Sequence, residues 1–313
     1  MRALLIANPN ATSTTPKFRF VAAHALAGTV DLEVVTTDHR GHALELARTS
    51  AGYDLVIGFG GDGTMNEIVN GLVDVAIGKS HGPRLGIIPG GDVNVFARAA
   101  GIASDPSEAT EQLIHSITNN RTRALNLGYL RWQENELTQT RIFNFCAGLG
   151  LDAAVVHEVD RLRKKGNQSS LSLYLVATSK AIINAARSGS SKPILLVAGE
   201  ETRKRLAMAL VTATDPWTYV KDRPLRPTPR ASFDSGIDMM AMTSGSVSAL
   251  FNAAQTLLRG GTPNGRSILH LHDQQSITLE GVKSLPLQAD GEAIGFAKHV
   301  EIFDLPKALE IHY

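Results

Sequence analysis

The densest group of residues that could do chemistry lies between Gly58 and Gly71, in the run GFGGDGTMNEIVNG. Glycine lets a backbone approach a phosphate closely and adopt positive φ, so that successive amide groups point at one anion. Thr64 and Asn66 add a hydroxyl and a side-chain amide, and the helix predicted after them adds the positive end of its dipole. The run directly follows the predicted strand residues Asp54–Ile57. This pattern predicts a phosphate-binding turn.

Two other phosphate-binding patterns fit the same run less well. Gly58, Gly60 and Gly63 have the spacing of the dinucleotide fingerprint, which normally follows the first strand and needs an acid about 20 residues further on. Position 83 is a proline, and the nearest acid, Asp74, falls within the predicted helix. No Gly-Lys-Ser/Thr follows, so the run is not a P-loop. A tight turn with a purely structural role stays an alternative for this run taken alone.

Three further turns carry polar side chains suited to the same task. The run Asn8–Ser13 follows the first predicted strand, and Pro89–Asn94 follows the fourth. Asp290, Gly291 and Glu292 lie far downstream, between two strand-like segments. Each is compatible with an ordinary turn. However, the runs that begin at Gly58, Asn8 and Pro89 all follow strands, at the position where open α/β sheets bind ligands. Together the turns indicate one ligand site.

Alternating strands and helices must position these turns before position 124. The strands are short and rich in Leu, Ile and Val, with helical spacing between them, which indicates a parallel α/β sheet covered on both faces. The predicted strands are Arg2–Ala7, Leu32–Thr36, Asp54–Phe59 and Arg84–Ile88, and the predicted helices are Thr15–Ala27, His42–Thr49, Met65–Val75, Val95–Ala100 and Asp105–Asn119.

After position 124 the pattern changes to strands joined by turns, which favours a β-rich second domain, either a sandwich or a distorted barrel. Two helices are also predicted there, Leu171–Ala186 and Ser246–Leu258. The predicted strands are Ala124–Trp132, Ile142–Ala147, Ile194–Ala198, Arg205–Ala213, Gly236–Met242, Ser267–Leu271, Gln275–Leu279 and Val300–Phe303.

Composition excludes several classes of protein. The 313 residues are 43% hydrophobic and 19% charged, which fits about two domains with buried cores and excludes general disorder. A formal charge of +1 and 5% aromatic residues argue against a nucleic-acid partner. The single cysteine, Cys146, cannot form an internal disulfide, which fits a reducing compartment. No apolar stretch has the length of a signal peptide or a membrane span. We therefore expect a cytoplasmic protein that touches a membrane only from outside.

In their order along the chain, these turns resemble the motifs of the diacylglycerol kinase catalytic-domain family, which includes bacterial soluble lipid kinases and sphingosine kinases. The likeness extends over nearly the whole chain, and Asp215–Tyr219 resembles a segment common among actinobacterial members. The matching segments are Asn8–Thr12 for NPxSG, Gly60–Thr64 for GGDGT, Pro89–Asn94 for PxGTxN, Gly148–Ala153 for GxGxDA and Asp290–Glu292 for DGE.

The resemblance implies an N-terminal three-layer α/β domain like those of phosphofructokinases and NAD kinases, over residues 1–124 with a C-terminal return at 304–313, and a C-terminal β-sandwich domain over residues 125–303. It also implies an ATP- and Mg²⁺-dependent lipid kinase that converts diacylglycerol to phosphatidate. Alternatives are a kinase for a sphingoid base, glycolipid or other lipid alcohol, and a catalytically impaired lipid- or nucleotide-binding regulator. The expected partners are ATP and a membrane lipid, which the protein would reach by peripheral contact at the inner membrane face. The resemblance does not decide whether the protein forms a homodimer.

By the same resemblance, Glu292 is the base that accepts the proton of the lipid hydroxyl, with Asp290 beside it. Asp62 is a second candidate for that base, and Asp62 and Asp290 are also candidates to hold Mg²⁺. The implied nucleotide contacts are Asn8, Pro9, Asn10, Ala11, Thr12, Thr37, Gly60, Gly61, Asp62, Gly63, Thr64, Met65, Asn66, Glu67, Asp92 and Asn94.

Two positions depart from the family pattern. Asp92 stands where the family usually has Thr or Ser, and a carboxylate there repels phosphate unless a metal lies between them or the side chain turns away. The family's structural Mg²⁺ site, which lies at an Asp-Gly pair in many members, has its counterpart in Ser232, Asp234 and Ile237. Ser235 occupies the expected aspartate position there, so either Asp234 substitutes through a one-residue shift or the site is absent. The basic run Arg161–Lys165 fits either a solvated turn or contact with an anionic bilayer.

Overall fold

The computed structural model of the chain describes residues 1–163, 194–198 and 202–313. Contacts divide the described residues into two compact units. The first consists of Met1–Leu127 and Leu305–Tyr313, and the second of Gly128–Asp304. The predicted helix Leu171–Ala186 lies outside the described residues. Among those described, no helix is long and apolar enough to cross a membrane.

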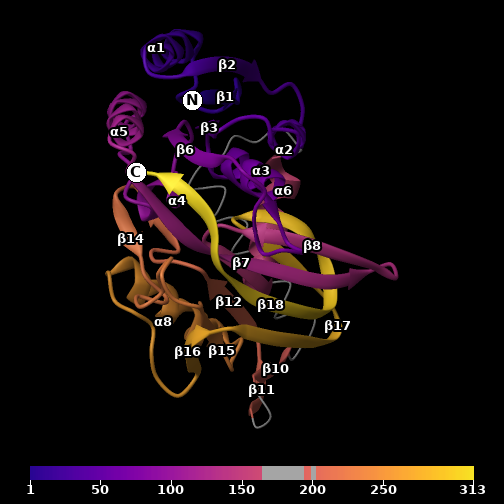
Figure 1. The fold of residues 1–313 in the computed structure, drawn as a ribbon. Helices are drawn as coiled ribbons and strands as arrows, with labels where there is room; N and C mark the ends of the chain where they lie inside the picture. The colour runs from indigo at the N-terminus through magenta and orange to yellow at the C-terminus, as the bar shows by residue number, and fades with distance from the viewer. Residues whose placement is uncertain (164–193, 199–201) are drawn as a thin grey trace. The chain divides into compact units, whose positions relative to one another are not determined.

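A parallel sheet forms the centre of the first unit, in the order β2 (Asp31–Thr36), β1 (Arg2–Ala7), β3 (Leu55–Gly60) and β6 (Arg84–Pro89) (Figure 1). The last residues of β18 (Glu292–His312) extend it, with Ile311 paired in parallel to Leu85 of β6. Every residue of β3 is buried, so this strand is apolar on both faces. Such a sheet must be covered on both faces.

Two helices of the first unit, α1 and α5, begin at a residue whose side chain caps them. The Thr15 hydroxyl accepts the amide of Phe18 at 3.3 Å at the start of α1. Asp105 accepts the amides of Ser107 and Glu108 at 2.8 and 3.1 Å at the start of α5. Both caps satisfy amides that have no partner inside the helix. The helices are α1 (Pro16–Ala27), α2 (His42–Arg48), α3 (Asp62–Leu72), α4 (Val95–Ala99) and α5 (Pro106–Thr118).

The sheet has a separate apolar layer on each face. Ile57 packs with Leu26 of α1 and Leu113 of α5 in one buried cluster. On the opposite face Gly58 lets α3 approach, because a Cβ at this position would lie 2.7 Å from the Met65 side chain. The first unit is therefore a three-layer α/β domain, as predicted.

Helix α3 begins and ends earlier than the predicted Met65–Val75. It begins at Asp62, whose carboxylate is held by amides of α4, as described below. It ends at Leu72 because the next two residues form β4 (Val73–Asp74), which pairs with β5 (Lys79–Ser80) in a small hairpin.

The second unit is β-rich and mainly antiparallel, as predicted. Strands β16, β15, β12, β9, β17 and β18 follow one another across it, while β10 pairs with β11 and β17, and β7 pairs with β8. The bounds are β7 (Thr122–Glu134), β8 (Leu137–Phe143), β9 (Cys146–Gly150), β10 (Ile194–Ala198), β11 (Thr202–Leu206), β12 (Met208–Thr212), β13 (Thr218–Val220), β14 (Arg223–Leu225), β15 (Ile237–Met242), β16 (Ile268–Gln274) and β17 (Ser276–Ala289).

Several predicted elements of the second unit were wrong in their bounds. The single strand predicted over Ile142–Ala147 is two strands, β8 and β9, interrupted at Asn144. The strand predicted over Arg205–Ala213 is likewise divided between β11 and β12. Helix α8 (Val247–Leu258) is as predicted and begins at the Ser246 cap.

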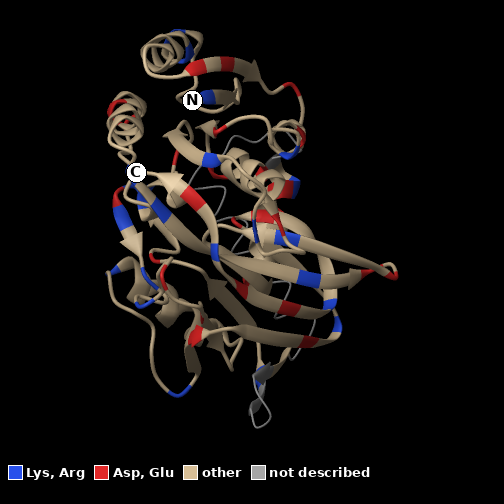
Figure 2. Cartoon of the chain, viewed as in Figure 1, with Lys and Arg blue, Asp and Glu red and all other residues tan. Residues whose placement is uncertain are grey.

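Helix α6 (Leu151–Arg163) was not predicted at all. It follows directly from β9 at Gly150, whose φ of +88° turns the chain sharply out of the strand. Figure 2 shows that basic and acidic residues are scattered over the elements of both units.

Candidate active site

Strand register brings four loop starts to one edge of the first unit's sheet. Ala7 is paired with Phe59 and with Thr36, and Gly60 is paired with Pro89. Asn8, Thr37, Gly61 and Gly90 follow these strand ends and therefore lie along the carboxyl edge of the sheet. The structure thus brings together the three predicted turns of this sheet, at the edge where open α/β sheets bind ligands.

The two glycine-rich turns pack backbone against backbone. The Gly90 amide donates to the Gly60 carbonyl at 2.8 Å. A Cβ on Gly91 would lie 2.8 Å from the Cα of Gly61, and one on Gly90 would lie 2.5 Å from the Thr14 hydroxyl. Side chains at these positions would separate the turns. The glycines are therefore needed for this close approach, whatever ligand the turns bind.

The turn after β1 is tied to the glycine run by its first residue. Asn8 Nδ2 donates to Thr64 Oγ1 at 2.9 Å, and Asn8 Oδ1 accepts the amide of Asn10 at 3.0 Å. Thr64 is buried in the first turn of α3, whose leading amides have no acceptor inside the helix. Side-chain and backbone donors of two separate turns are therefore held beside the positive end of α3.

The turn after β6 is fixed by Asn94. Its backbone is left-handed (φ +52°), and its side chain both accepts the Gly91 amide at 2.9 Å and donates to the Gly91 carbonyl at 2.6 Å. Asp92 lies at the exposed tip of this turn, where its Oδ1 accepts the hydroxyl of Thr12 at 2.6 Å. The turns after β1 and β6 are thereby joined.

Asp62 connects α3 to α4. Its Oδ2 accepts the Val95 amide and its Oδ1 accepts the Phe96 amide, both at 3.0 Å. Burial raises the pKa of the Asp62 carboxyl, and the two amide bonds partly offset that rise. Both oxygens serve to cap α4, so Asp62 holds the site together; its role as a base stays a prediction.

Glu67 positions the loop between β2 and α2. Its Oε1 accepts the amide of Gly41 at 2.9 Å, and Gly41 has a φ of +90°. Thr37, at the start of this loop, is buried, and its amide donates to the Ala7 carbonyl at 2.9 Å. Glu67 therefore has a structural role in this loop.

The remaining predicted nucleotide contacts differ in their accessibility. Pro9 is exposed and Ala11 is partly exposed in the turn after β1. In contrast, Met65 and Asn66 are buried in α3, where they face the interior. The nucleotide contacts of all these residues stay predictions.

In the second unit, Asp290 and Gly291 form the two-residue loop between β17 and β18. Their φ angles are +48° and +76°, and Ala289 is paired with Glu292 across the hairpin. Positive φ at both central residues is the type I′ geometry that favours Asp-Gly. Glu292 is therefore placed at the first position of β18 by the turn that precedes it.

The Asp290 carboxylate accepts backbone amides at the interruption between β8 and β9. Its Oδ2 accepts the amide of Asn144 at 2.7 Å, and its Oδ1 accepts the amides of Phe145 and Cys146, both at 3.0 Å. These bonds draw the backbone out of strand geometry, which explains why the predicted single strand is interrupted there. The main role of Asp290 in the structure is to anchor the hairpin to this break.

The carboxylate of Glu292 faces a cation. Arg141 Nη2 lies 3.5 Å from Glu292 Oε2, and both side chains are partly buried, with 20% and 26% of their surfaces exposed. Glu292 is thus a partly accessible and oriented carboxylate, as a proton acceptor must be.

Two further residues that were not predicted support the same hairpin. Gln288 Oε1 accepts the Gly291 amide at 3.0 Å, while its Nε2 donates to Asp152 Oδ2 at 2.9 Å. Burial raises the pKa of Asp152 to about 6, against the lowering effect of the Gln288 bond. The sequence did carry a signal, since Asp152 belongs to the GxGxDA segment and Gln288 precedes the DGE turn by one residue.

Asn144 is a third residue near this hairpin that was not predicted. Its side chain is fully buried, and neither its Oδ1 nor its Nδ2 has a hydrogen-bond partner among the residues that the structure describes. A buried amide without partners destabilises a fold by about 1–3 kcal/mol, so this side chain does not stabilise the hairpin through hydrogen bonds.

The predicted metal segment is ordered by its own hydrogen bonds. The Asp234 amide donates to Ser232 Oγ at 3.2 Å, and Ile237 is buried at the start of β15. The metal site over Ser232, Asp234 and Ile237 stays a prediction. Of the basic run, Arg161 makes two 2.7 Å bonds to Glu158 in α6, while residues 164 and 165 lie outside the described residues.

Comparison with known proteins shows what this chain is similar to. The diacylglycerol kinase of Bacillus subtilis (strain 168) is 36% identical to it over 138 residues, which cover 42% of this chain and 43% of that protein. A diacylglycerol kinase structure from Bacillus anthracis (strain Sterne) covers all of this chain and 96% of its own, with a TM-score of 0.70 and 20% identity. Yeast NADH kinase in complex with NADH covers 99% of this chain and 82% of its own, with a TM-score of 0.55 and 12% identity.

The structural matches have low identity and therefore show the fold, which is α/β followed by a β-rich part. The chain spans less than half the length of the curated relatives it matches. The model of the diacylglycerol kinase catalytic domain matches residues 2–127, which contain the glycine-rich turns. This part of the chain is similar to the catalytic domain of diacylglycerol kinases.

Proposed function

We propose that the protein is a lipid kinase that transfers the γ-phosphoryl group of ATP to the hydroxyl of diacylglycerol, giving phosphatidate. The observation that carries this proposal is the pair of glycine-rich turns packed at the carboxyl ends of β3 and β6, within the residues that match the diacylglycerol kinase catalytic domain. The curated relatives with this name support diacylglycerol as the acceptor.

The triphosphate would bind to donors that the fold already holds in place. The leading amides of α3 point out of the helix, and the Asn8 side chain is fixed beside Thr64. Thr12 joins these donors to the turn that carries Asp92, because its hydroxyl donates to Asp92 Oδ1. Phosphoryl transfer depends mainly on positioning and charge stabilisation, which a rigid row of donors supplies.

Asp92 is the carboxylate in this group that best fits Mg²⁺. Both oxygens of Asp62 and of Asp290 accept backbone amides, whereas Asp92 is exposed and accepts one bond, from Thr12. Mg²⁺ prefers a few carboxylates together with water and substrate phosphates. When bound, the ion would neutralise charge on the phosphates. Asp92 would then attract the metal–ATP complex, although its negative charge alone would repel the phosphates.

Glu292 is the residue proposed to accept the proton of the lipid hydroxyl. A hydroxyl is a poor nucleophile at neutral pH, so a carboxylate must take its proton as the phosphoryl group transfers. Glu292 is partly exposed and paired with Arg141, while the Asp62 oxygens are held by α4. These contacts support Glu292 over Asp62 as the base. A lipid acceptor also implies peripheral contact with the membrane that contains it.

A second candidate function is a nucleotide-binding regulator that does not transfer phosphate. Asp92 is the observation that favours it, since a carboxylate replaces the usual hydroxyl residue. If Asp92 blocked phosphate binding, its replacement by threonine would create activity. If it helps to hold Mg²⁺, the same replacement would weaken activity.

Purified protein incubated with γ-labelled ATP, Mg²⁺ and mixed micelles tests the proposal. Separate micelles would contain diacylglycerol, a sphingoid base or a glycolipid, and a known lipid kinase would run in parallel. We expect label in phosphatidate from the diacylglycerol micelles. Label in another lipid would support the kinase and correct the acceptor. No labelled lipid, while the control enzyme works, would overturn the proposal.

A further inference from the structure

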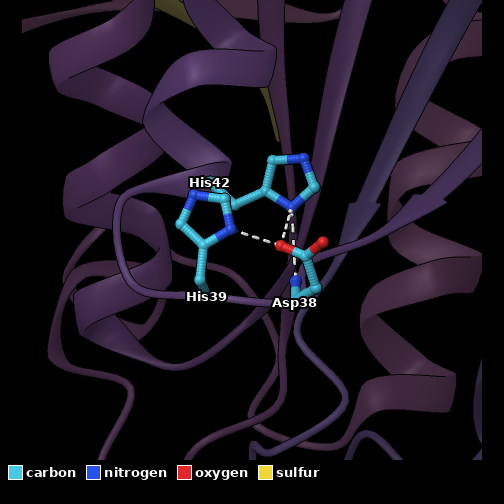
Figure 3. A group of neighbouring side chains, drawn as sticks. All are labelled: Asp38, His39 and His42. Carbon is cyan, nitrogen blue, oxygen red and sulfur yellow. Dashed lines mark hydrogen bonds and ion pairs between the residues drawn. The ribbon is translucent and has the colours of Figure 1, made fainter.

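Two imidazole rings and a carboxylate meet in the loop between β2 and α2 (Figure 3). Asp38 Oδ1 lies 2.8 Å from His42 Nδ1 and hydrogen-bonds to His39 Nδ1. The two rings are stacked, with centroids 4.8 Å apart and an angle of 6° between their planes. One donor atom from each of the three residues lies within 4.8 Å of the other two. Both ring nitrogens face the Asp38 carboxylate, so three potential ligand atoms are already gathered in one small volume.

The backbone holds this loop in shape from both ends. The Thr37 amide is bonded to the Ala7 carbonyl at 2.9 Å, immediately before Asp38. At the other end Gly41 adopts positive φ, and Glu67 accepts its amide at 2.9 Å. The Asp38 amide also lies 3.2 Å from His42 Nδ1. The three side chains are thus brought together by a fixed loop rather than by chance contact between free surface groups.

The donor set selects one class of ion. Imidazole nitrogen suits zinc and similar transition metals, while Mg²⁺ prefers oxygen ligands. Bonds of about 2.0–2.1 Å in a tetrahedral zinc site place neighbouring ligand atoms about 3.3 Å apart. The observed 2.8 Å between Asp38 Oδ1 and His42 Nδ1 would need to open by only a few tenths of an ångström.

A fourth residue lies where an outer partner of such a site is expected. Glu45 Oε2 is 3.5 Å from His39 Nε2, the ring nitrogen that faces away from Asp38. Histidines that bind a metal through one nitrogen commonly donate the other to a carboxylate, which orients the ring. Asp38 and His39 have 73% and 53% of their side chains exposed, so a metal could enter from solvent and keep a water ligand.

We propose that Asp38, His39 and His42 form a binding site for a divalent transition metal of the zinc class, with Glu45 as the outer partner of His39. The site is distinct from the carboxylate proposed for Mg²⁺ at Asp92. Because Asp38 directly follows Thr37, a bound metal would also stiffen the loop that carries this predicted ATP contact. The inference does not depend on the proposed kinase activity.

The test is titration of the full chain with Zn²⁺, using protein without a histidine tag that has been stripped with a chelator and dialysed. Calorimetry is expected to show one zinc per chain with micromolar or tighter affinity. His39→Ala and His42→Ala should each weaken binding at least tenfold, and Glu45→Gln should weaken it less. His299→Ala is the matched control, since His299 is a partly exposed histidine of the second unit whose Nδ1 lies 3.4 Å from Glu280 Oε1.

Co²⁺ provides a second measurement that does not depend on enzyme activity. The Co²⁺ form of the unaltered chain should show visible absorption typical of tetrahedral coordination, and His42→Ala should lose it. Circular dichroism of each variant checks that it is folded. Zinc binding of equal affinity in the His39→Ala, His42→Ala and unaltered chains would overturn the proposal, as would the absence of binding by the unaltered chain.

Discussion

The hydroxyl of Thr12 donates to Oδ1 of Asp92 at 2.6 Å, which joins the turn after β1 to the turn after β6. This bond gives a physical account of an acidic residue in a turn expected to bind phosphate. One oxygen of Asp92 is directed at a hydroxyl of the protein, and the side chain is otherwise exposed. The carboxylate therefore has a defined orientation and remains accessible to a cation.

Replacing Asp92 with asparagine should weaken the dependence on Mg²⁺ in a specific way. Asparagine keeps an oxygen for the Thr12 hydroxyl but removes the charge that would attract the metal. We expect the Mg²⁺ concentration for half-maximal activity to rise about tenfold, equivalent to about 1.4 kcal/mol. Thr12→Val keeps the charge and should have a smaller effect. A Mg²⁺ titration curve that Asp92→Asn leaves unchanged would contradict this assignment.

Removing the side chain of Asp62 should destabilise the protein. Asp62→Ala leaves the amides of Val95 and Phe96 without their acceptors. Loss of a capping side chain typically lowers the free energy of unfolding by about 0.5–2 kcal/mol. Urea denaturation followed by circular dichroism measures this. Asp31→Asn, at an exposed position in the same unit, is the control. Equal stability of Asp62→Ala and the unaltered chain would show that these bonds contribute nothing.

Adding a methyl group between the glycine-rich turns should disturb both stability and nucleotide binding. A Cβ on Gly91 would lie 2.8 Å from Gly61 Cα and 3.0 Å from Asn94 Oδ1, so Gly91→Ala must push the turns apart. Overpacking of this kind costs about 1–3 kcal/mol. Gly52→Ala is the control, because its Cβ would meet no atom closer than 4.0 Å. Thermal unfolding and ATP titration measure the two effects. If Gly91→Ala had the same unfolding midpoint and ATP affinity as Gly52→Ala, the close approach of the two turns would be refuted.

The first unit could be predicted well because its signals are local. Buried parallel strands read as short apolar runs, and residues such as Thr15 and Asp105 mark helix starts directly. The grouping of the turns also followed from the sequence, because parallel strands place their carboxyl ends at one edge. The hydrogen bonds that side chains of one turn make to another turn could not be predicted. The Asp62 bonds to Val95 and Phe96, and the Thr12 bond to Asp92, join residues far apart in sequence.

The second unit was harder to predict because contacts between residues far apart in sequence determine its strands. A long-range contact, the Asp290 carboxylate with the amides of Asn144 to Cys146, divides an apolar run that reads as one strand. Helix α6 was missed because it follows β9 directly, with no residue between the last residue of the strand and the first residue of the helix. The network of Asp152 and Gln288 likewise depends on pairing that no local pattern shows.

Asp152→Asn should stabilise the protein at neutral pH and much less in acid. The pKa of Asp152 is about 6 in the folded chain, above the ordinary 3.8, so the folded state disfavours the ionised form. This group therefore lowers the free energy of unfolding as pH rises from about 4 to about 6, and the full penalty remains above that range. Asparagine removes the charge and keeps an oxygen for Gln288.

We expect Asp152→Asn to raise the free energy of unfolding by about 1–2 kcal/mol at pH 7.5 and by close to nothing near pH 4. Each pKa unit corresponds to about 1.4 kcal/mol, and the expected gain is set below the full value because the side chain is partly exposed. Urea denaturation at several pH values measures the difference. Asp222→Asn, at an exposed position of the second unit, should show no such trend. A gain that is the same at both pH values would exclude Asp152 as its source.

The most direct test of the account compares the unaltered chain with Glu292→Gln for transfer of labelled phosphate from ATP to diacylglycerol. Glutamine keeps the size of the side chain and a hydrogen bond for Arg141 but cannot accept the proton, and general-base catalysis typically contributes about 10²–10⁴-fold. We predict that turnover falls by at least about 100-fold, with unchanged ATP affinity and unfolding midpoint. Near-normal transfer by folded Glu292→Gln would contradict the account.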